Sequence, residues 1–158
     1  MGVRQLSEAP VRPFRLGATP SSLAWRVFRV PTVESDPVRV REAVARGVTL
    51  ARVKTVAAAY GFNQAELAAQ LGLTVRTLDR KRKAGERLGA KASDNLARLV
   101  RVFDRAVEVL GEEGRAGRWL QTANPALGGD APRAWLFTDA GTTEVLRVLG
   151  RLEHGVFS

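Results

Sequence analysis

The chain has 158 residues, of which 45% are hydrophobic, and a formal net charge of +9 at pH 7. This length suffices for one domain of ordinary size or for two small ones that share a core. The absence of cysteine excludes disulfides and thiolate chemistry, and because no long apolar run or N-terminal apolar segment occurs, we expect no membrane span, no secretory signal and a cytoplasmic location.

Residues 1–33 are predicted to be a flexible basic arm with a candidate short helix. Residues 1–20 contain three prolines and scattered arginines but no sustained hydrophobic period, which is typical of a segment that does not pack. Ser21 and Ser22 provide caps for a helix that runs to Val30 before Pro31. The apolar residues on one side of this helix are Leu23, Val27 and Val30.

Two helices are predicted between residues 36 and 61. Asp36 followed by Pro37 is a start signal, because proline is tolerated at the first helical position, and Gly47 ends this helix. Thr49 starts the next helix, which Gly61 stops in the left-handed conformation. The predicted inner face of the first helix contains Val38, Arg41, Val44 and Ala45, and that of the second contains Leu50, Val53, Val56, Ala57 and Tyr60.

The middle of the chain has the spacing of a helix-turn-helix. Asn63 and Glu66 form a capping box that opens the first helix, residues 64–71. Thr74 caps the second helix, residues 75–84. The positions expected to be buried on both sides of the turn are Leu67, Ala68, Leu71, Leu73 and Leu78.

Gly72 occupies the turn between these two helices, where a positive φ is needed and glycine adopts it at the lowest cost. Ala68 is small where the two helices must approach closely. The last position that is usually apolar in this motif is Lys81, which is a departure from the general pattern.

The remaining helices complete an all-α prediction. Ser93 is predicted to cap the longest helix, which runs to about Leu110. Its inward residues are Leu96, Leu99, Val100, Phe103, Val107 and Leu110, and shorter helices follow at about 115–122, 131–137 and 140–154. No stretch alternates long enough to predict a strand. The expected organisation is a helix-turn-helix bundle over residues 34–112 and a small helical domain over residues 113–158.

The second helix of the motif carries the side chains expected of a DNA-recognition helix, in which the first residues face base edges and later basic residues hold phosphates. The candidate DNA-binding residues are Thr74, Arg76, Thr77, Arg80, Lys81 and Lys83. The alternative is that this charge run is only a solvated helix face. The first 114 residues hold 20 basic and 12 acidic residues, and the last 44 hold five and four, so a polyanionic partner is expected in the first part.

Five spaced pieces occur in order near the end of the chain: Trp119-Leu120, Asn124–Gly129, the Pro132 turn, Thr138 with Gly141, and Leu152–Gly155. They resemble the toxin-binding C-terminal domain of the Xre/MbcA/ParS family of antitoxins. The basic run around Lys81 agrees with the family's helix-turn-helix, so the resemblance covers about residues 36–158. It implies a dimeric antitoxin that represses its own operon and inhibits a RES-domain toxin, an enzyme that consumes NAD or transfers ADP-ribose from it.

The resemblance also implies that the C-terminal region covers the toxin's catalytic cleft. The candidate toxin-binding residues are Arg151, Glu153, His154, Val156, Phe157 and Ser158. A Phe157 side chain and the Ser158 carboxylate would fill an apolar pocket and pair with a toxin arginine, in the manner of C-terminal carboxylate capture. The alternatives are that this terminal peptide is free and that His154 only caps its helix. Trp119 and Trp135 are interpreted as scaffold.

An enzyme is not expected, because the chain has one histidine, no cysteine, no paired carboxylates in an apolar setting and no glycine-rich nucleotide loop. We therefore predict no catalytic, metal or cofactor site. The expected partners are a RES-domain toxin, operator DNA and a second copy of the chain, in a homodimer and a higher toxin–antitoxin hetero-oligomer. Candidate dimer surfaces are the helices at 23–30 and 37–60, although a core role fits their apolar residues equally well. The alternative function is a stand-alone transcriptional regulator with a C-terminal protein-interaction domain.

Overall fold

The computed structural model describes residues 22–155, so the predicted arm over residues 1–20 and the predicted plug at 156–158 lie outside the described residues. The elements in chain order are α1 (Leu23–Phe28), α2 (Pro37–Arg46), α3 (Leu50–Tyr60), α4 (Gln64–Gln70), α5 (Val75–Ala84), α6 (Ala90–Leu110), α7 (Glu113–Gln121), the 3-10 helices η1 (Pro125–Leu127) and η2 (Pro132–Trp135), and α8 (Asp139–Glu153). Over this range the only β-type pairing is an isolated bridge between Thr49 and Arg87, and the all-α prediction is confirmed.

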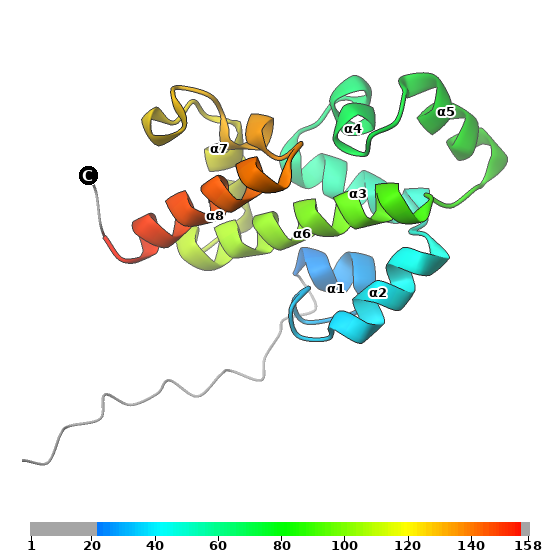
Figure 1. The fold of residues 1–158 in the computed structure, drawn as a ribbon, viewed down its shortest axis with the longest axis horizontal. Helices are drawn as coiled ribbons and strands as arrows, with labels where there is room; N and C mark the ends of the chain where they lie inside the picture. The colour runs from blue at the N-terminus through cyan, green and yellow to red at the C-terminus, as the bar shows by residue number, and fades with distance from the viewer. Residues whose placement is uncertain (1–21, 156–158) are drawn as a thin grey trace, which may run out of the picture.

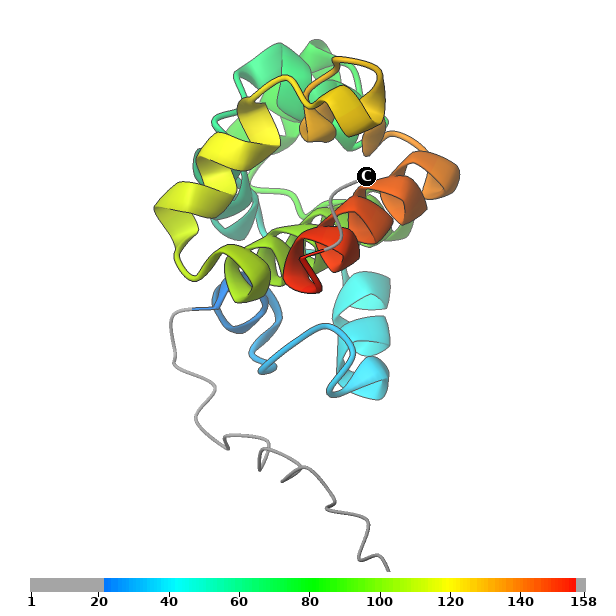
Figure 2. The ribbon, with the colours of Figure 1, turned by 90° about the vertical axis from the view of Figure 1, so that its left-hand side faces the viewer.

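Helix α6 is the central element of the fold (Figure 1). It contacts α1, α2 and α3 as well as α7 and α8. Helices α1 and α2 lie on one side of α6, and α8 lies along another side (Figures 1 and 2). The buried side chains of α6 include Leu96, Leu99, Val100, Val102 and Phe103. Because these residues pack against elements before and after α6, one continuous core serves both halves of the chain.

The helix starts that the sequence predicts from local signals are confirmed. The Asp36 carboxylate accepts a hydrogen bond from the Arg39 amide at 2.9 Å, which caps α2. At α4 the Asn63 side chain accepts from the Glu66 amide at 2.9 Å, and the Glu66 carboxylate accepts from the Asn63 amide at 2.8 Å. Such caps satisfy amides that have no partner inside the helix.

Ser93 does not cap the longest helix, which begins three residues earlier with Gly89 as its N-cap. Instead Ser93 lies inside α6 and is fully buried, and its hydroxyl accepts a hydrogen bond from the Val48 amide at 3.0 Å. The bridge between Thr49 and Arg87 brings the start of α3 against α6. A buried amide needs an acceptor, and Ser93 supplies it across the core.

The predicted inner face of α2 is wrong. Val38, Arg41 and Ala45 are exposed, Val44 is half-buried, and the buried residue of this helix is Val40. The helix meets α6 along the side that carries Val40, which a helical pattern with few large apolar residues does not specify.

The candidate dimer helix α1 packs entirely against the core. Its apolar residues Leu23, Ala24 and Val27 are fully buried, and Phe28 is 3% exposed. Two backbone amides at its N-terminus donate to the Asp104 carboxylate of α6, both at 2.8 Å. Helix α1 is therefore fixed to α6 and offers no apolar surface to a second copy.

The helix expected over residues 131–137 is only the single 3-10 turn η2. It ends where the backbone oxygen of Trp135 packs against Gly141, so closely that a Cβ on Gly141 would lie 2.0 Å from it. Thr138 then caps α8, its hydroxyl accepting from the Gly141 amide at 3.0 Å.

Candidate functional site

Helices α4 and α5 form the helix-turn-helix that the sequence predicts. Gly72 has a φ of +70° in the turn, and the Leu73 amide donates to the Ala68 oxygen at 2.8 Å. Ala68 is 1% exposed, as expected for a close approach of the two helices. Of the other predicted core positions, Leu67, Leu71 and Leu78 are buried and Leu73 is half-buried.

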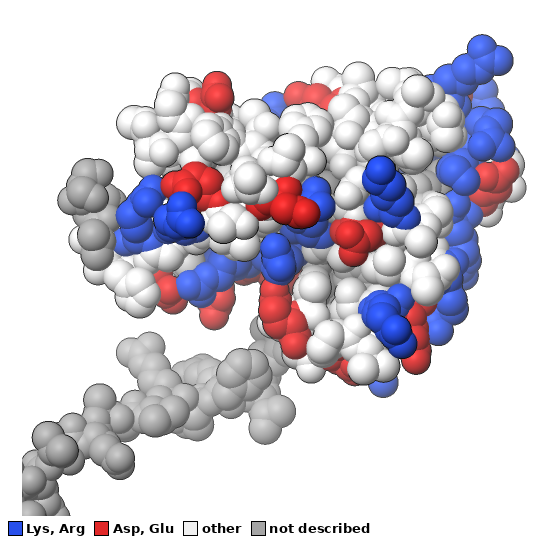
Figure 3. All heavy atoms as spheres, viewed as in Figure 1, with Lys and Arg blue, Asp and Glu red and all other residues white. Residues whose placement is uncertain are grey.

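Helix α5 lies at one end of the molecule, away from the C-terminal elements α7 and α8 (Figure 1). Lysine and arginine side chains gather along this edge (Figure 3). A shallow depression of about 490 Å³ on α5 is lined by Arg76, Asp79, Arg80, Lys83 and Ala84. The predicted residues Arg76, Arg80 and Lys83 thus share one surface, which is exposed and basic.

Two acidic residues hold the cations of α5 in place. Asp79 pairs with Lys83 at 3.2 Å and also with Arg82. Glu86 pairs with Lys81 at 2.9 Å and with Arg80 at 3.2 Å. The hydrogen bond from Lys83 lowers the pKa of Asp79, and the hydrogen bond from Lys81 lowers the pKa of Glu86.

Arg76 is the most available of the predicted cations, since it forms no ion pair with any residue between 22 and 155. Lys81 is the least available. Its side chain is 19% exposed, and its amine contacts Glu86 and donates to the Arg87 oxygen at 3.4 Å. The Lys81 stem therefore fills the position that is usually apolar in this motif, while its charge reaches Glu86 at the edge.

Thr74 and Thr77 are engaged with each other at the start of α5. The Thr74 hydroxyl accepts from the Thr77 amide at 3.1 Å, and the two hydroxyl oxygens lie 2.9 Å apart. Thr74 is exposed and Thr77 is half-buried. Both are positioned by the cap, and Thr74 faces solvent at the end of the helix that would enter a DNA groove.

The C-terminal turn is built as the sequence predicts, with the Asn124 side chain accepting from the Ala126 amide at 3.0 Å. The Asn124 amide donates to the Asp130 oxygen at 3.0 Å and closes the loop. Trp119 and Trp135 are half-buried and pack against the core. This arrangement agrees with their interpretation as scaffold.

The predicted toxin-binding residues of α8 are partly engaged in ion pairs. Arg151 lies 3.6 Å from Glu144, and Glu153 pairs with Arg105 of α6. The hydrogen bond from Arg105 lowers the pKa of Glu153. His154 is the C-cap of α8, and its side chain is 74% exposed.

The other three predicted residues, Val156, Phe157 and Ser158, lie outside the described residues. The structure therefore brings Arg151, Glu153 and His154 together at the end of α8, with His154 the most exposed of them.

A second hollow, of about 700 Å³, lies in the C-terminal part and was missed by the sequence analysis. Trp135 and Phe137 contribute its aromatic side chains, and Phe137 is 52% exposed. Its lining is otherwise mostly small and apolar, with Asp130 and Glu144 as the charged members. The signal was the run Trp135-Leu136-Phe137, because three successive large apolar residues in one short turn cannot all point into the core.

No helix between residues 22 and 155 is long and apolar enough to cross a membrane. Across the same described range, no three histidine or acidic side chains come together as a group that could hold a metal ion.

Two family models match successive parts of the chain. Residues 39–101 match the antitoxin Xre-like helix-turn-helix domain. Residues 105–155 match the antitoxin Xre/MbcA/ParS C-terminal toxin-binding domain. The first match contains α4 and α5, and the second contains the hollow and the end of α8.

Curated relatives are similar over most of the chain. An antitoxin Xre from Yersinia enterocolitica is 32% identical over 142 residues, which are 89% of this chain and 95% of the relative. An antitoxin Xre from Photorhabdus laumondii is 27% identical over 87% of this chain and 93% of its own length. One from Pseudomonas putida is 32% identical over 83 residues, about half of each chain.

Proposed function

The chain belongs to the Xre antitoxin family, and from this membership we propose that it neutralises a RES-domain toxin and represses its own operon by binding operator DNA. One observation supports this proposal most. The basic helix α5 and the C-terminal part that matches a toxin-binding domain lie at different ends of the molecule (Figure 1). One chain can therefore hold DNA and a toxin together. The NAD-consuming or ADP-ribosylating chemistry belongs to the toxin, and this protein acts in the cytoplasm without a catalytic role.

In the operator complex, α5 enters the major groove. Arg76 reads a base or a nearby phosphate, and Arg80 and Lys83 bind phosphates, with Thr74 and Thr77 at the groove end of the helix. The support is the shared exposed surface of Arg76, Arg80 and Lys83. One bidentate contact between an arginine and guanine contributes about 1–3 kcal/mol of base discrimination. Lys81 acts mainly through Glu86, which also holds Arg80.

The operator-binding form is a homodimer, because a single helix-turn-helix reads only half a site. Of the predicted dimer surfaces, the outer face of α2 is the one with an exposed large apolar residue, Val38, at 61% exposure. A Val38→Glu variant should be monomeric in analytical ultracentrifugation and bind a half-site only. A dimer of unchanged stability would place the interface elsewhere.

The toxin is bound by the end of α8, where Arg151, Glu153 and His154 contact its surface and Val156, Phe157 and Ser158 enter its cleft. His154 supports this placement through its exposed side chain beside Glu153, 3.9 Å away. A terminal carboxylate next to an apolar side chain suits a pocket that carries an arginine.

Co-expression with the adjacent RES-domain gene tests the proposal. The full chain should restore growth and co-purify with the toxin, whereas a chain that ends at Gly155 should lose most of the inhibition. The matched control is Thr143→Ala, an exposed α8 hydroxyl that bonds only to its own helix, at the Asp139 oxygen, 2.9 Å away. Full inhibition by the shortened chain would refute the plug. Operator binding without any effect on the toxin would favour a stand-alone transcriptional regulator.

A further inference from the structure

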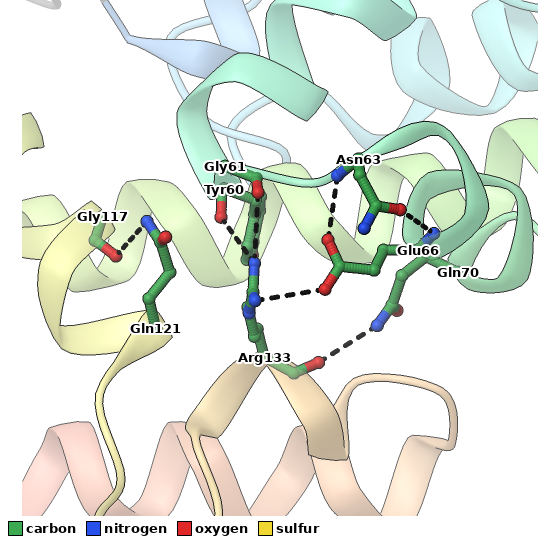
Figure 4. Close-up of polar contacts among 8 residues, drawn as sticks. All are labelled: Tyr60, Gly61, Asn63, Glu66, Gln70, Gly117, Gln121 and Arg133. Carbon is green, nitrogen blue, oxygen red and sulfur yellow. Dashed lines mark hydrogen bonds and ion pairs between the residues drawn. The ribbon is translucent and has the colours of Figure 1, made fainter.

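The 3-10 turn η2 has two sides that face different partners. Ala134 and Trp135 line the hollow of the C-terminal part. Their neighbour Arg133 reaches the other way, to the junction between α3 and α4 (Figure 4). A single short turn thus lies between a surface in the toxin-binding domain and the first helix of the DNA-binding motif.

Arg133 makes three hydrogen bonds at this junction. Its guanidinium donates to the Tyr60 and Gly61 oxygens at 3.3 and 3.2 Å, which are free at the end of α3. It also pairs with Glu66 of α4 at 3.2 Å. The guanidinium carbon lies 5.6 Å from the centre of the Phe62 ring, within range of a cation–π contact. The side chain is only 24% exposed, so solvent screens these contacts less than it screens a surface pair.

The Glu66 carboxylate serves both sides of the junction. One oxygen binds Arg133, and the other accepts from the Asn63 amide in the capping box that starts α4. Gln70, which is 5% exposed, donates from its side chain to the Arg133 oxygen at 3.0 Å. Helix α4 is therefore attached to η2 near both of its ends, and α5 follows α4 through their packed leucines.

We propose that η2 is a relay: a toxin segment seated in the hollow displaces η2, and Arg133 transmits this displacement to α4 and α5, so that toxin binding changes operator affinity. The occupant suited to the hollow is an apolar side chain next to a basic one, because Trp135 and Phe137 line the hollow together with Asp130 and Glu144. The relay rests on the proposed function. By thermodynamic linkage, operator DNA changes toxin affinity by the same factor.

Operator affinity is measured by fluorescence anisotropy on the full chain, free and saturated with the purified RES-domain toxin. Bound toxin should change the wild-type operator Kd by about fivefold or more, a usual size for coupled sites. Arg133→Ala should reduce this change to less than about twofold while toxin and DNA each still bind. Arg133→Lys keeps the charge without the fork of donors and should give an intermediate change.

A second variant covers a loss of folding in Arg133→Ala. Glu66→Gln removes the ion pair with Arg133 but keeps an oxygen for the Asn63 amide, so α4 stays capped while the coupling falls. Arg115→Ala is the matched control, because Arg115 is an exposed arginine of α7 that pairs locally with Glu112 at 3.5 Å.

The outcomes separate the two proposals. If the toxin binds but leaves the wild-type operator Kd unchanged, the relay is wrong and the antitoxin function stands. Coupling of wild-type size in Glu66→Gln, or in folded Arg133→Ala, would also overturn the relay. If the toxin does not bind the wild-type chain at all, the proposed function fails and the relay fails with it.

Discussion

Neutralising Arg80 and Lys83 together, as Arg80→Gln/Lys83→Gln, should flatten the salt dependence of operator binding. Both side chains line the depression on α5, and they are 62% and 75% exposed. Each lost phosphate contact reduces the slope of log K against log salt by about 0.9, so two contacts reduce it by about 1.8. The affinity advantage of the wild type should then shrink by about 60-fold for each tenfold increase in salt.

Fluorescence anisotropy with a labelled promoter fragment, over a tenfold range of KCl, measures this slope. The control is Arg115→Gln/Arg118→Gln, which removes two exposed positive charges from α7, at the other end of the molecule from α5 (Figure 1). The control should keep the wild-type slope. An unchanged slope in the α5 variant, or an equal decrease in both variants, would remove α5 from the DNA interface.

Three further predictions concern stability and are checked by chemical denaturation. Gly47→Ala should cost about 3 kcal/mol or more, because Gly47 has a φ of +80° and a Cβ would lie 2.1 Å from a backbone oxygen, whereas Gly85→Ala, with open space, should cost far less. Ser93→Ala should cost about 1–3 kcal/mol by leaving the buried Val48 amide without its acceptor; a neutral substitution would show that this bond is dispensable. Burial raises the pKa of Asp104, so its contribution to stability falls as pH rises from its ordinary pKa to the raised one. The stability difference between wild type and Asp104→Asn should fall over the same pH range, and a rising difference would contradict the assignment.

The parts of the fold that depend on neighbouring residues could be predicted from the sequence. The Asn63–Glu66 box and the Asp36 cap act over three residues, and glycine in the turn at residue 72 meets a local backbone requirement. The parts that depend on packing could not. Ser93 has a capping residue's chemistry, but its partner is the Val48 amide, 45 residues away.

The site divides in the same way. The basic surface of α5 follows from helical spacing, so Arg76, Arg80 and Lys83 were found together. The sequence does not say which of these cations acidic residues hold, because Glu86 lies beyond the end of α5. Arg133 was missed for a related reason: its contacts are carbonyls and a carboxylate more than sixty residues earlier in the chain.

The central position of α6 bears on how this protein is removed from a cell. Helix α6 supplies buried side chains to the packing of the elements before and after it, so neither half keeps its core when α6 unfolds. A protease that pulls α6 apart would release the toxin and the operator in one event. The lifetime of a single helix would then set both the end of inhibition and the start of new synthesis.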